Sequence, residues 1–400
     1  MSDLPPAIVV GLQGVNGLQT ARVLASRRIP VIAISGDRRD PSNRTRVCRR
    51  IVYADTRSEE LIEALVALGP SLEAKGVLVP CYDMPVLLLS RHRAALSQWY
   101  HVPLPPEDVI ETLTDKVSFY EFAKSRGLPI PETRILRNAE DARIAARELR
   151  FPAVLKPARS ADPAWEKVSA FKGYRVHNAE ELIALHERGR KLSDVLLVQE
   201  WVQGPETNLY TCNLYFDTAS RPLVTFVTRK IRQWPLTTGE GCLGQEDPND
   251  TILEEALRLF RSVGYTGLGY LEMKRDERTD RLLITEPNIG RPTGMSALAE
   301  AAGVELLATM YRDTLGLPLP EQRTQSYRGV KWMHVRRDAQ SAFHYWRVGE
   351  LSLGDWYRSV RGKKTYADVS WSDPMPFLAD VWREIGLALD PGRRRVDLRK

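Results

Sequence analysis

Residues 268–294 read LGYLEMKRDERTDRLLITEPNIGRPTG, two apolar runs separated by a polar turn. Their alternation predicts two strands joined as a hairpin. Each strand carries a carboxylate, Glu272 or Glu286, and Asn288 lies two positions after Glu286, on the same face of the strand. Two carboxylates and an amide oxygen suit Mg²⁺ bound to phosphates; the alternative is a pair of surface strands with ordinary charges. Because Pro287 has no backbone N–H, we expect the ladder of hydrogen bonds to end there.

The chain before the hairpin is rich in strands. Residues 208–217 (NLYTCNLYFD) and 222–235 (PLVTFVTRKIRQWP) alternate as in an antiparallel sheet with one face buried. Residues 251–264 predict a helix among the strands, and 299–316 predict a closing helical region.

Several cations stand at predicted strand or helix ends. Lys156 ends the apolar run FPAVLKPA and needs an anionic partner if it is buried, although a lysine that snorkels to solvent is the simpler interpretation. Lys116 begins a helix, where a cation is mildly unfavourable against the helix dipole. Arg229, Lys230 and Arg232 lie close together on one strand, and form either a solvated edge or a polyphosphate clamp.

The stretch LLVQEWVQGPE, residues 196–206, is a predicted buried strand that runs into a connector. A connector between two lobes can offer backbone N–H and C=O groups to an adenine. Glu206, after the Gly-Pro turn, can accept hydrogen bonds from ribose hydroxyls.

The N-terminal hundred residues alternate strands and helices, which predicts a parallel sheet covered by helices. The turn VVGLQGVNG, residues 9–17, raises the alternative of an NAD(P)-dependent oxidoreductase, and Asp37 lies where a ribose-binding acid would sit. However, the glycines are spaced GxxGxxG and not GxGxxG, and Gln13 occupies the place where the pyrophosphate needs a glycine.

Composition sets the limits for these interpretations. The chain has 400 residues, of which 43% are hydrophobic, with a formal net charge of +6 and four scattered cysteines. Two or three domains, reduced thiols in a cytoplasm and no zinc site are expected. The sequence shows no membrane-spanning run and no secretory signal. Basic clusters at 37–50 and 392–400 suit solvated loops or attraction of anionic substrates, and no nucleic-acid-binding motif accompanies them.

The motifs in their order resemble the ATP-grasp superfamily of carboxylate–amine ligases. The matching pieces are residues 114–133, 151–158, 196–206, 267–276 and 284–291, and with the preceding βαβ domain they cover about three quarters of the chain. The resemblance implies that ATP, held between two lobes, phosphorylates a carboxylate to an acylphosphate, which an amine then attacks.

The resemblance also implies roles for individual residues. For the nucleotide these are Lys116, Lys156, Lys172, Glu200, Val202, Glu206 and Arg229; for Mg²⁺, with Mn²⁺ as a substitute, they are Glu272, Glu286 and Asn288. Arg291 and Lys230 are the expected catalytic cations, because negative charge builds up in the transition state. The helix start at Gln13, Gly14 and Asn16 becomes a candidate site for the substrate carboxylate or its acylphosphate.

This sequence departs from the family pattern in two places. The segment between Ala158 and Tyr174 is poor in glycine, and there Lys167 and Lys172 would replace backbone amides near the phosphates. Arg291 follows Asn288 by three residues where the family has two, and the glycine between them would let the chain bulge. If the altered loop means lost activity, the protein is a non-catalytic ATP-binding protein.

We therefore expect an α/β and α+β protein in three parts: a Rossmann-like domain (1–111), an ATP-grasp domain of two lobes (112–319) and an aromatic and basic C-terminal cap (320–400). Within the cap, KWMHVRRD predicts a strand that returns to the core, which favours a cap over the alternative that the tryptophans and arginines bind an amphipathic substrate or touch a membrane surface. The expected partners are small carboxylate and amine substrates, without nucleic acid or membrane contact, and a homodimer is a candidate assembly.

Overall fold

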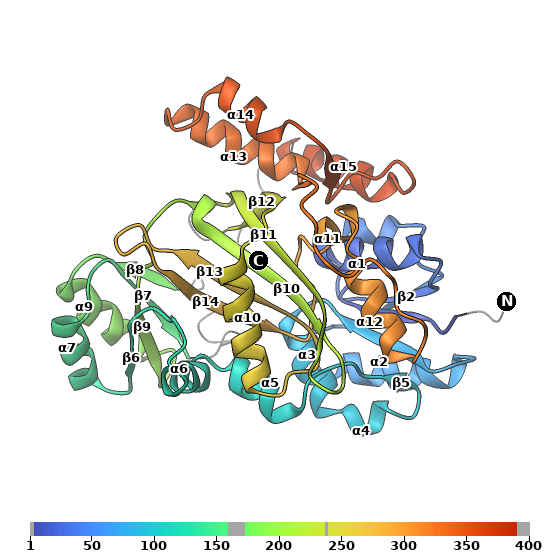
Figure 1. Ribbon diagram of the computed structural model, residues 1–400, viewed down its shortest axis with the longest axis horizontal. Coiled ribbons are helices and arrows are strands. Elements are labelled where there is room, and N and C mark those ends of the chain that lie inside the picture. Colours follow the sequence, from blue (N-terminus) through green and yellow to red (C-terminus); the bar gives the residue numbers. More distant parts are fainter. Residues whose placement is uncertain (1–3, 159–172, 237–238, 390–400) are drawn as a thin grey trace. The chain divides into compact units, whose positions relative to one another are not determined.

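The computed structural model (Figure 1) describes residues 4–158, 173–236 and 239–389. The chain forms two compact units. The first unit contains Met1–Glu107, Tyr210–Tyr270 and Ile289–Lys400, and the second contains Asp108–Leu209 and Leu271–Asn288. The division into three domains, which was read from motifs along the sequence, stays a prediction.

The first unit begins with a parallel sheet, as the βαβ pattern predicts. Its strand order is β3-β2-β1-β4-β5, and each adjacent pair is parallel. The strands are β1 (Ala7–Val10), β2 (Val31–Ser35), β3 (Arg50–Tyr53), β4 (Gly76–Pro80) and β5 (Tyr100–His101). The connecting helices are α1 (Gly14–Ser26), η1 (Pro41–Arg44), α2 (Glu60–Leu68), η2 (Gly69–Ser71), α3 (Asp83–Arg91) and α4 (Arg93–Leu96).

A seven-stranded sheet of order β14-β13-β10-β11-β12-β15-β16 follows. Its strands are β10 (Leu209–Phe216), β11 (Pro222–Trp234), β12 (Glu240–Glu246), β13 (Gly267–Arg275), β14 (Leu282–Ile289), β15 (Lys331–Met333) and β16 (Lys364–Tyr366). The pair β10–β11 is antiparallel, as predicted, and β12, which was not predicted, pairs with β11 in the same way. The boundary between the two units falls within β13 and β14.

The prediction that only one face of this sheet is buried is wrong for β10, in which seven of eight residues are buried. Neighbouring side chains on a strand point to opposite faces. Tyr215 donates a hydrogen bond to Asp313 of α12 (Leu306–Thr314), whereas Phe216 packs against Phe260 of α10 (Asp250–Ser262). Helices therefore cover β10 on both faces.

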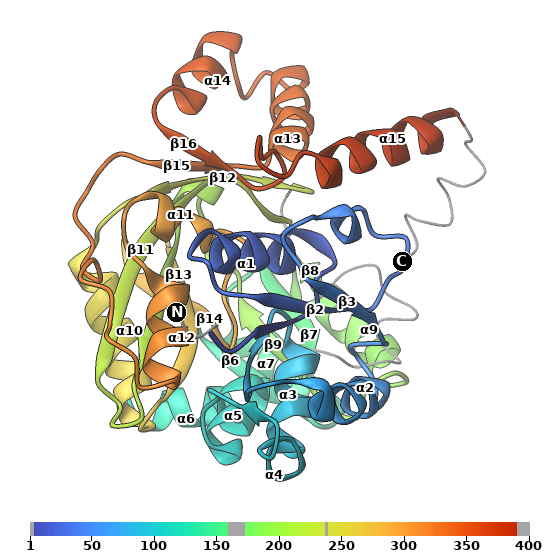
Figure 2. The ribbon, with the colours of Figure 1, turned by 90° about the vertical axis from the view of Figure 1, so that its right-hand side faces the viewer.

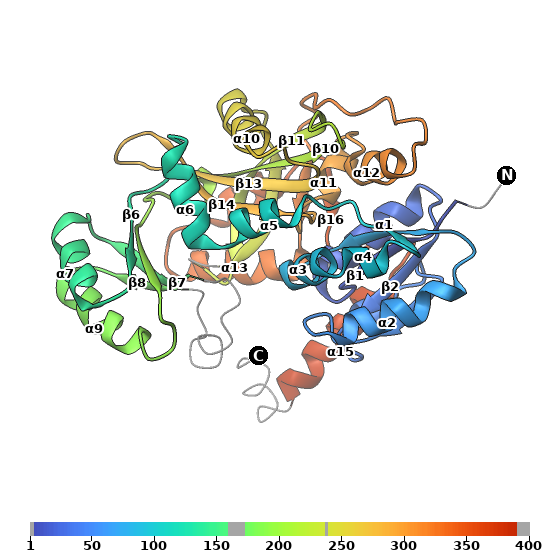
Figure 3. The ribbon, with the colours of Figure 1, turned by 90° about the horizontal axis from the view of Figure 1, so that it is seen from below.

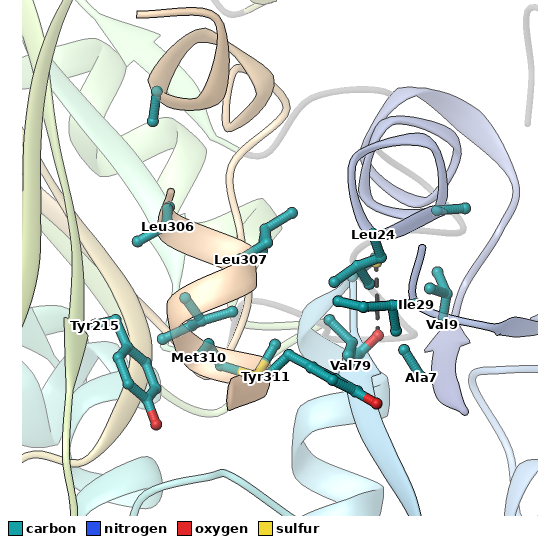
Figure 4. Packing of buried hydrophobic residues seen from close by; sticks show 14 of the residues in the cluster. Ala7, Val9, Leu24, Ile29, Val79, Tyr215, Leu306, Leu307, Met310 and Tyr311 are labelled. Carbon is teal, nitrogen blue, oxygen red and sulfur yellow. Dashed lines mark hydrogen bonds between the residues drawn. The ribbon is translucent and has the colours of Figure 1, made fainter. Parts of the chain in front are cut away.

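The main core of the first unit joins the two sheets (Figure 4). Leu306, Leu307, Met310 and Tyr311 of α12 lie in one buried cluster with residues of β1, β4 and α1 on one side and Tyr215 on the other. The short helix α11 (Ala297–Ala301) contributes to the same cluster. The closing helical region thus fixes the parallel sheet to the antiparallel sheet within this unit.

The C-terminal segment returns to the core through β15, as predicted, and Trp332 on this strand is buried. Trp332 donates a hydrogen bond from its ring Nε1 to Gln19 of α1 at 2.7 Å. Figure 2 shows β15 and β16 beside β12. Three helices complete the unit: α13 (Val335–Arg347), α14 (Leu353–Val360) and α15 (Met375–Leu389).

The second unit is built on an antiparallel sheet of order β6-β9-β7-β8. Its strands are β6 (Thr133–Leu136), β7 (Ala153–Pro157), β8 (Tyr174–Val176) and β9 (Leu196–Glu200), and its helices are α5 (Glu107–Thr114), α6 (Lys116–Ser125), α7 (Ala139–Glu148), α9 (Ala179–Gly189) and the short η3 (Glu206–Asn208). The helices α7 and α9 lie together on one side of this sheet (Figure 3), and their apolar residues share a core with β7 and β9.

Candidate functional site

Lys156 is the central cation of the candidate nucleotide site. It lies near the end of β7, where its Nζ donates a hydrogen bond to Gln199 Oε1 on β9 at 2.9 Å. Burial lowers the pKa of Lys156, and the negative charge of Glu286 partly opposes this effect. The second unit therefore brings Lys156 close enough to Glu286 on the hairpin for their charges to interact.

A second predicted lysine lies at the same end of β7. Asp115 caps α6 by accepting a hydrogen bond from the Ser118 N–H, and Lys116 is the first residue of that helix. The backbone N–H of Lys116 donates to Ala158 O at 3.2 Å, and its Nζ lies 3.4 Å from Pro157 O. The structure thus places Lys116 and Lys156 at one strand end, a concentration of positive charge that suits a phosphate chain.

The connector after β9 is joined to the β13–β14 hairpin by several hydrogen bonds. Lys274 donates from Nζ to Val202 O at 3.0 Å, and Glu277 donates from its backbone N–H to Gln203 O at 3.3 Å. Glu200 accepts a hydrogen bond from the backbone N–H of Arg150 at 3.1 Å. The side chain of Glu200 thus holds neighbouring structure, and its predicted contact with adenine would come from its backbone.

Glu206 begins η3, immediately after Pro205. Two residues further on, Asn208 donates to Arg275 O at 3.3 Å. Glu206 therefore lies in the connector that is hydrogen-bonded to the hairpin. Its predicted contact with ribose stays a prediction.

The three predicted metal ligands lie on adjacent strands of the hairpin. Glu272 is on β13, half-buried between the buried Leu271 and Met273, and its backbone carbonyl accepts a hydrogen bond from Thr285 Oγ1 of β14 at 3.1 Å. On β14 Glu286 is exposed and Asn288 is buried. This set of oxygen donors fits a Mg²⁺ site of the kind that a bound polyphosphate completes. Among the described residues no group of three or more His, Cys, Asp or Glu side chains could hold a metal ion.

The expectation that strand pairing ends at Pro287 is wrong, because β14 continues to Ile289. The reason is the position of β14, which comes first in the order of the described strands. A proline on an edge strand breaks no ladder hydrogen bond when its nitrogen faces away from the neighbouring strand.

Arg291 belongs to the first unit. Its guanidinium donates to Asp83 at the start of α3 and to the Tyr270 hydroxyl, and it lies 5.2 Å from the centroid of the Tyr270 ring. Gly290 has φ +70°, a conformation that favours glycine, so the chain does turn between Asn288 and Arg291 as predicted. The catalytic role of Arg291 remains a prediction.

The three cations of β11 have separate partners. Arg229 forms an ion pair with Asp247 at 3.5 Å, and Lys230 is buried and donates to Gln233 at 3.0 Å. Arg232 is buried against Asp338 of α13 at 2.7 Å. The register shifts on both sides of Arg232, which turns its side chain away from the regular alternation. The chain itself therefore neutralises Arg232, and only Arg229 and Lys230 remain candidates for phosphate contacts.

The glycine-rich turn between β1 and α1 is filled by a tyrosine. A Cβ at Gly11 would lie 2.6 Å from the Tyr82 ring, and one at Gly14 would lie 2.9 Å from its hydroxyl. Tyr82 donates a hydrogen bond to Gln13 O. These glycines accommodate Tyr82 and not a dinucleotide, which removes the main support for the oxidoreductase interpretation.

The predicted substrate residues in this turn also have partners within the first unit. Gln13 donates to Thr56 Oγ1 at 3.1 Å, and Asn16 donates to Cys81 O at 3.3 Å. The Gly14 N–H lies 3.4 Å from a carboxylate oxygen of Asp40. The helix start thus already faces one carboxylate, and its contact with a substrate carboxylate stays a prediction. Lys167 and Lys172 lie outside the described residues.

Sequence reasoning missed three residues that support the site. Gln199 holds Lys156, and Lys274 holds the Val202 carbonyl. Trp201 lies beside two cations, with Arg175 at 4.9 Å and Lys274 at 5.8 Å from its ring. Lys274 is two positions after Glu272 on a strand, so alternation could have placed both on one face. The contact of Gln199 with Lys156 could be predicted only from the register of β7 against β9.

Curated relatives match about half of the chain. D-aspartate ligase from Enterococcus faecium (strain Aus0004) is 27% identical over 227 residues, which cover 54% of this chain and 53% of that protein. D-alanine–D-alanine ligase B from Pseudomonas putida (strain KT2440) is 23% identical over 207 residues, which cover 48% of this chain and 60% of that protein. The matched residues thus span little more than half the length of these relatives. No model of a known protein family matches the chain.

Solved structures match more of the chain at lower identity. The biotin carboxylase domain of Hydrogenobacter thermophilus 2-oxoglutarate carboxylase, in complex with MgADP, ADP and bicarbonate, has a TM-score of 0.62 and 17% identity over 81% of this chain and 72% of that one. N5-carboxyaminoimidazole synthetase from Staphylococcus aureus has a TM-score of 0.62 and 15% identity, and the match covers 80% of this chain and 79% of that one.

These likenesses define the class of fold, an α/β and α+β architecture shared with ligases and carboxylases. The chain has the ATP-grasp fold, and the resemblance to the ATP-grasp superfamily of carboxylate–amine ligases is confirmed.

Proposed function

We propose that this protein is an ATP-dependent ligase that activates a carboxylate as an acylphosphate and joins it to an amine. The observation that carries the proposal is the placement of Lys156 and Lys116 together at the end of β7, in the same unit as the hairpin of Glu272, Glu286 and Asn288 and the connector bonded to it. Two cations at one strand end, with carboxylate and amide oxygens on the hairpin of the same unit, suit a polyphosphate with its metal ion. The ligase names of the curated relatives support the same reaction class.

In this proposal Lys156 and Lys116 bind the phosphates, and Gln199 orients the Lys156 ammonium. Glu272, Glu286 and Asn288 hold Mg²⁺, with Mn²⁺ as a substitute. The bound metal would neutralise negative charge on the phosphates. The backbone at Glu200 and Val202 meets adenine, and Glu206 meets the ribose.

The reaction proceeds in two displacements. A substrate carboxylate oxygen attacks the terminal phosphorus and ADP leaves; the amine nitrogen then attacks the acyl carbon, phosphate leaves, and the nitrogen loses a proton. Arg291 and Lys230 stabilise the developing negative charge, Arg229 binds the nucleotide, and Gln13, Gly14 and Asn16 receive the substrate carboxylate.

The names of the curated relatives indicate that D-amino acids are the first substrates to screen. A cytoplasmic location, where the four cysteines stay reduced, and a homodimeric assembly are parts of the same proposal.

Two measurements test this function. Mg-ATP should raise the melting temperature of the purified protein whereas NADPH should not, because only a ligand of the native state stabilises it. ADP release should then appear with one of the carboxylate and amine pairs screened by mass spectrometry. A shift with Mg-ATP but no turnover with any pair would favour a non-catalytic ATP-binding protein.

The Glu286→Gln variant tests the site itself. It should abolish turnover, since it removes a metal ligand and the charge that faces Lys156. Glu277→Gln is the matched control, because this exposed residue lies in the turn of the same hairpin and bonds the connector through its backbone. Equal turnover in the two variants would show that the metal assignment is wrong.

A further inference from the structure

The C-terminal helices expose apolar side chains and bury polar ones, the reverse of the usual arrangement. On α15 the exposed side chains include Met375, Leu378, Trp382 and Ile385, which recur every three or four residues along one face. The opposite face carries Asp380 and Glu384, which pair with Arg336 of α13 at 3.0 and 3.4 Å.

The same reversal occurs on α13, and α14 also exposes apolar side chains. On α13, Asp338 and Ser341 are fully buried, whereas Phe343 and Trp346 are 57% and 50% exposed. On α14, Leu353 and Tyr357 are 69% and 60% exposed, while the partly buried Trp356 donates to Asp338 at 3.1 Å. Packing against the rest of the unit therefore does not account for the apolar faces.

We name these exposed side chains the aromatic surface. Its residues are Phe343, Trp346, Val348, Leu353, Tyr357, Trp371, Met375, Leu378, Trp382 and Ile385. Trp371, between β16 and α15, is 95% exposed. Ten of the fifteen large apolar side chains that are exposed among the described residues belong to this one surface, a concentration that indicates an interaction site.

The charges beside the aromatic surface are mostly positive. Within residues 335–386 the exposed charged side chains are five basic and two acidic: Arg347, Arg358, Arg361, Lys363 and Arg383, against Glu350 and Asp355. Tryptophan and tyrosine with arginine and lysine form the composition that binds the interface of an anionic lipid bilayer.

We infer that the aromatic surface docks on a membrane surface that contains anionic lipids. A second copy of the chain fits less well, because a symmetric dimer interface sets a surface against itself and would bring the basic side chains together. A lipid surface provides opposite charge and an apolar layer at once. The inference does not depend on the proposed ligase activity, and it reverses the expectation from sequence that the protein makes no membrane contact.

Cosedimentation with vesicles tests this inference on the full chain. Vesicles of phosphatidylcholine with phosphatidylglycerol should bind the protein about tenfold or more strongly than phosphatidylcholine vesicles, and added salt should weaken the binding. The double variant Leu378→Ser/Trp382→Ser should bind about tenfold less, because it removes apolar area that enters the interface. Lys363→Glu with Arg347→Glu should lower binding only to the anionic vesicles.

Tyr327→Ser is the matched control, since Tyr327 is 67% exposed but lies outside the aromatic surface. All these variants should keep the wild-type melting temperature, because the changed side chains are exposed. Equal vesicle binding by the wild type and Leu378→Ser/Trp382→Ser would overturn the inference. A dimer in light scattering that Leu378→Ser/Trp382→Ser dissociates, without vesicle binding, would overturn it in favour of a second copy.

Discussion

Two cations, the buried Arg232 on β11 and the half-buried Lys156 on β7, differ in how their charge is balanced. Arg232 lies 2.7 Å from the Asp338 carboxylate and 2.7 Å from the Ser359 hydroxyl. Lys156 has the neutral Gln199 as its hydrogen-bond partner, and Glu286 acts on it only through longer-range attraction. Among the described residues Lys156 forms no ion pair.

This difference separates a structural charge from one that awaits a ligand. A buried charge with a good partner stabilises the fold only modestly, but the loss of that partner is costly. A half-buried lysine without such a partner is poorly balanced, since desolvation lowers its pKa. An anionic ligand would restore its balance, which agrees with the proposed phosphate contact.

The largest expected effect comes from Lys156→Met. Turnover of the proposed ligase should fall about a thousandfold, because a cation preorganised for the phosphates is lost. The melting temperature without ligand should stay equal or rise, since the substitution removes a poorly balanced charge. ADP release and thermal unfolding check both parts, with the exposed Lys191→Met as control. A large loss of stability would show that Lys156 is structural.

Asp338→Ala should lower stability, in contrast to Lys156→Met. It leaves Arg232 buried without its carboxylate and should lower the free energy of unfolding by about 3 kcal/mol. Urea denaturation measures this change. The double variant Arg232→Met/Asp338→Leu should recover most of the loss, because it removes both charges. If the double variant is no more stable than Asp338→Ala, packing and not charge balance explains the effect.

Glu300 on α11 lies between these two cases. Its buried carboxylate forms an ion pair with Arg27 at 3.1 Å, but the Arg27 side chain is partly exposed. Burial outweighs Arg27 and raises the pKa of Glu300 from 4.5 to about 7. Its protonated form is therefore favoured in the folded state, and its stabilising contribution is full below pH 4.5 and is lost as the pH rises through 7.

The Glu300→Gln variant should remove this pH dependence. Between about pH 5 and about pH 8 the wild type should lose about 2 kcal/mol of stability relative to the variant, the smallest of the three effects. Urea denaturation at both pH values measures the difference. If the two proteins lose the same stability over this range, Arg27 keeps Glu300 charged throughout.

The sequence predicts those features that local patterns determine. The βαβ order and the hairpin of β13 and β14 were predicted from alternation, and the helix that begins at Lys116 was also predicted. The partners of buried charges could not be predicted, since Gln199 reaches Lys156 only through the register of β7 on β9, and Asp338 is far from Arg232 in sequence. The role of the glycines in the first turn likewise depends on Tyr82, which lies between β4 and α3.

The C-terminal segment shows a different limit of sequence reasoning. Periodicity indicates that α15 is amphipathic, but it does not say which face meets the protein. We expected a cap that buries its aromatic residues. The pairs of Arg336 with Asp380 and Glu384 instead turn the polar face inward and leave Trp382 exposed.

Pro287 affects how this protein can associate with other chains. An edge strand with free N–H and C=O groups is a template on which a foreign strand can add and start aggregation. β14 comes first in the order of its sheet, and Pro287 removes one donor from the middle of the segment that carries Glu286 and Asn288. A strand that tried to extend the sheet would lack this bond, so the proline helps to keep the edge with the predicted metal ligands from being covered by another polypeptide.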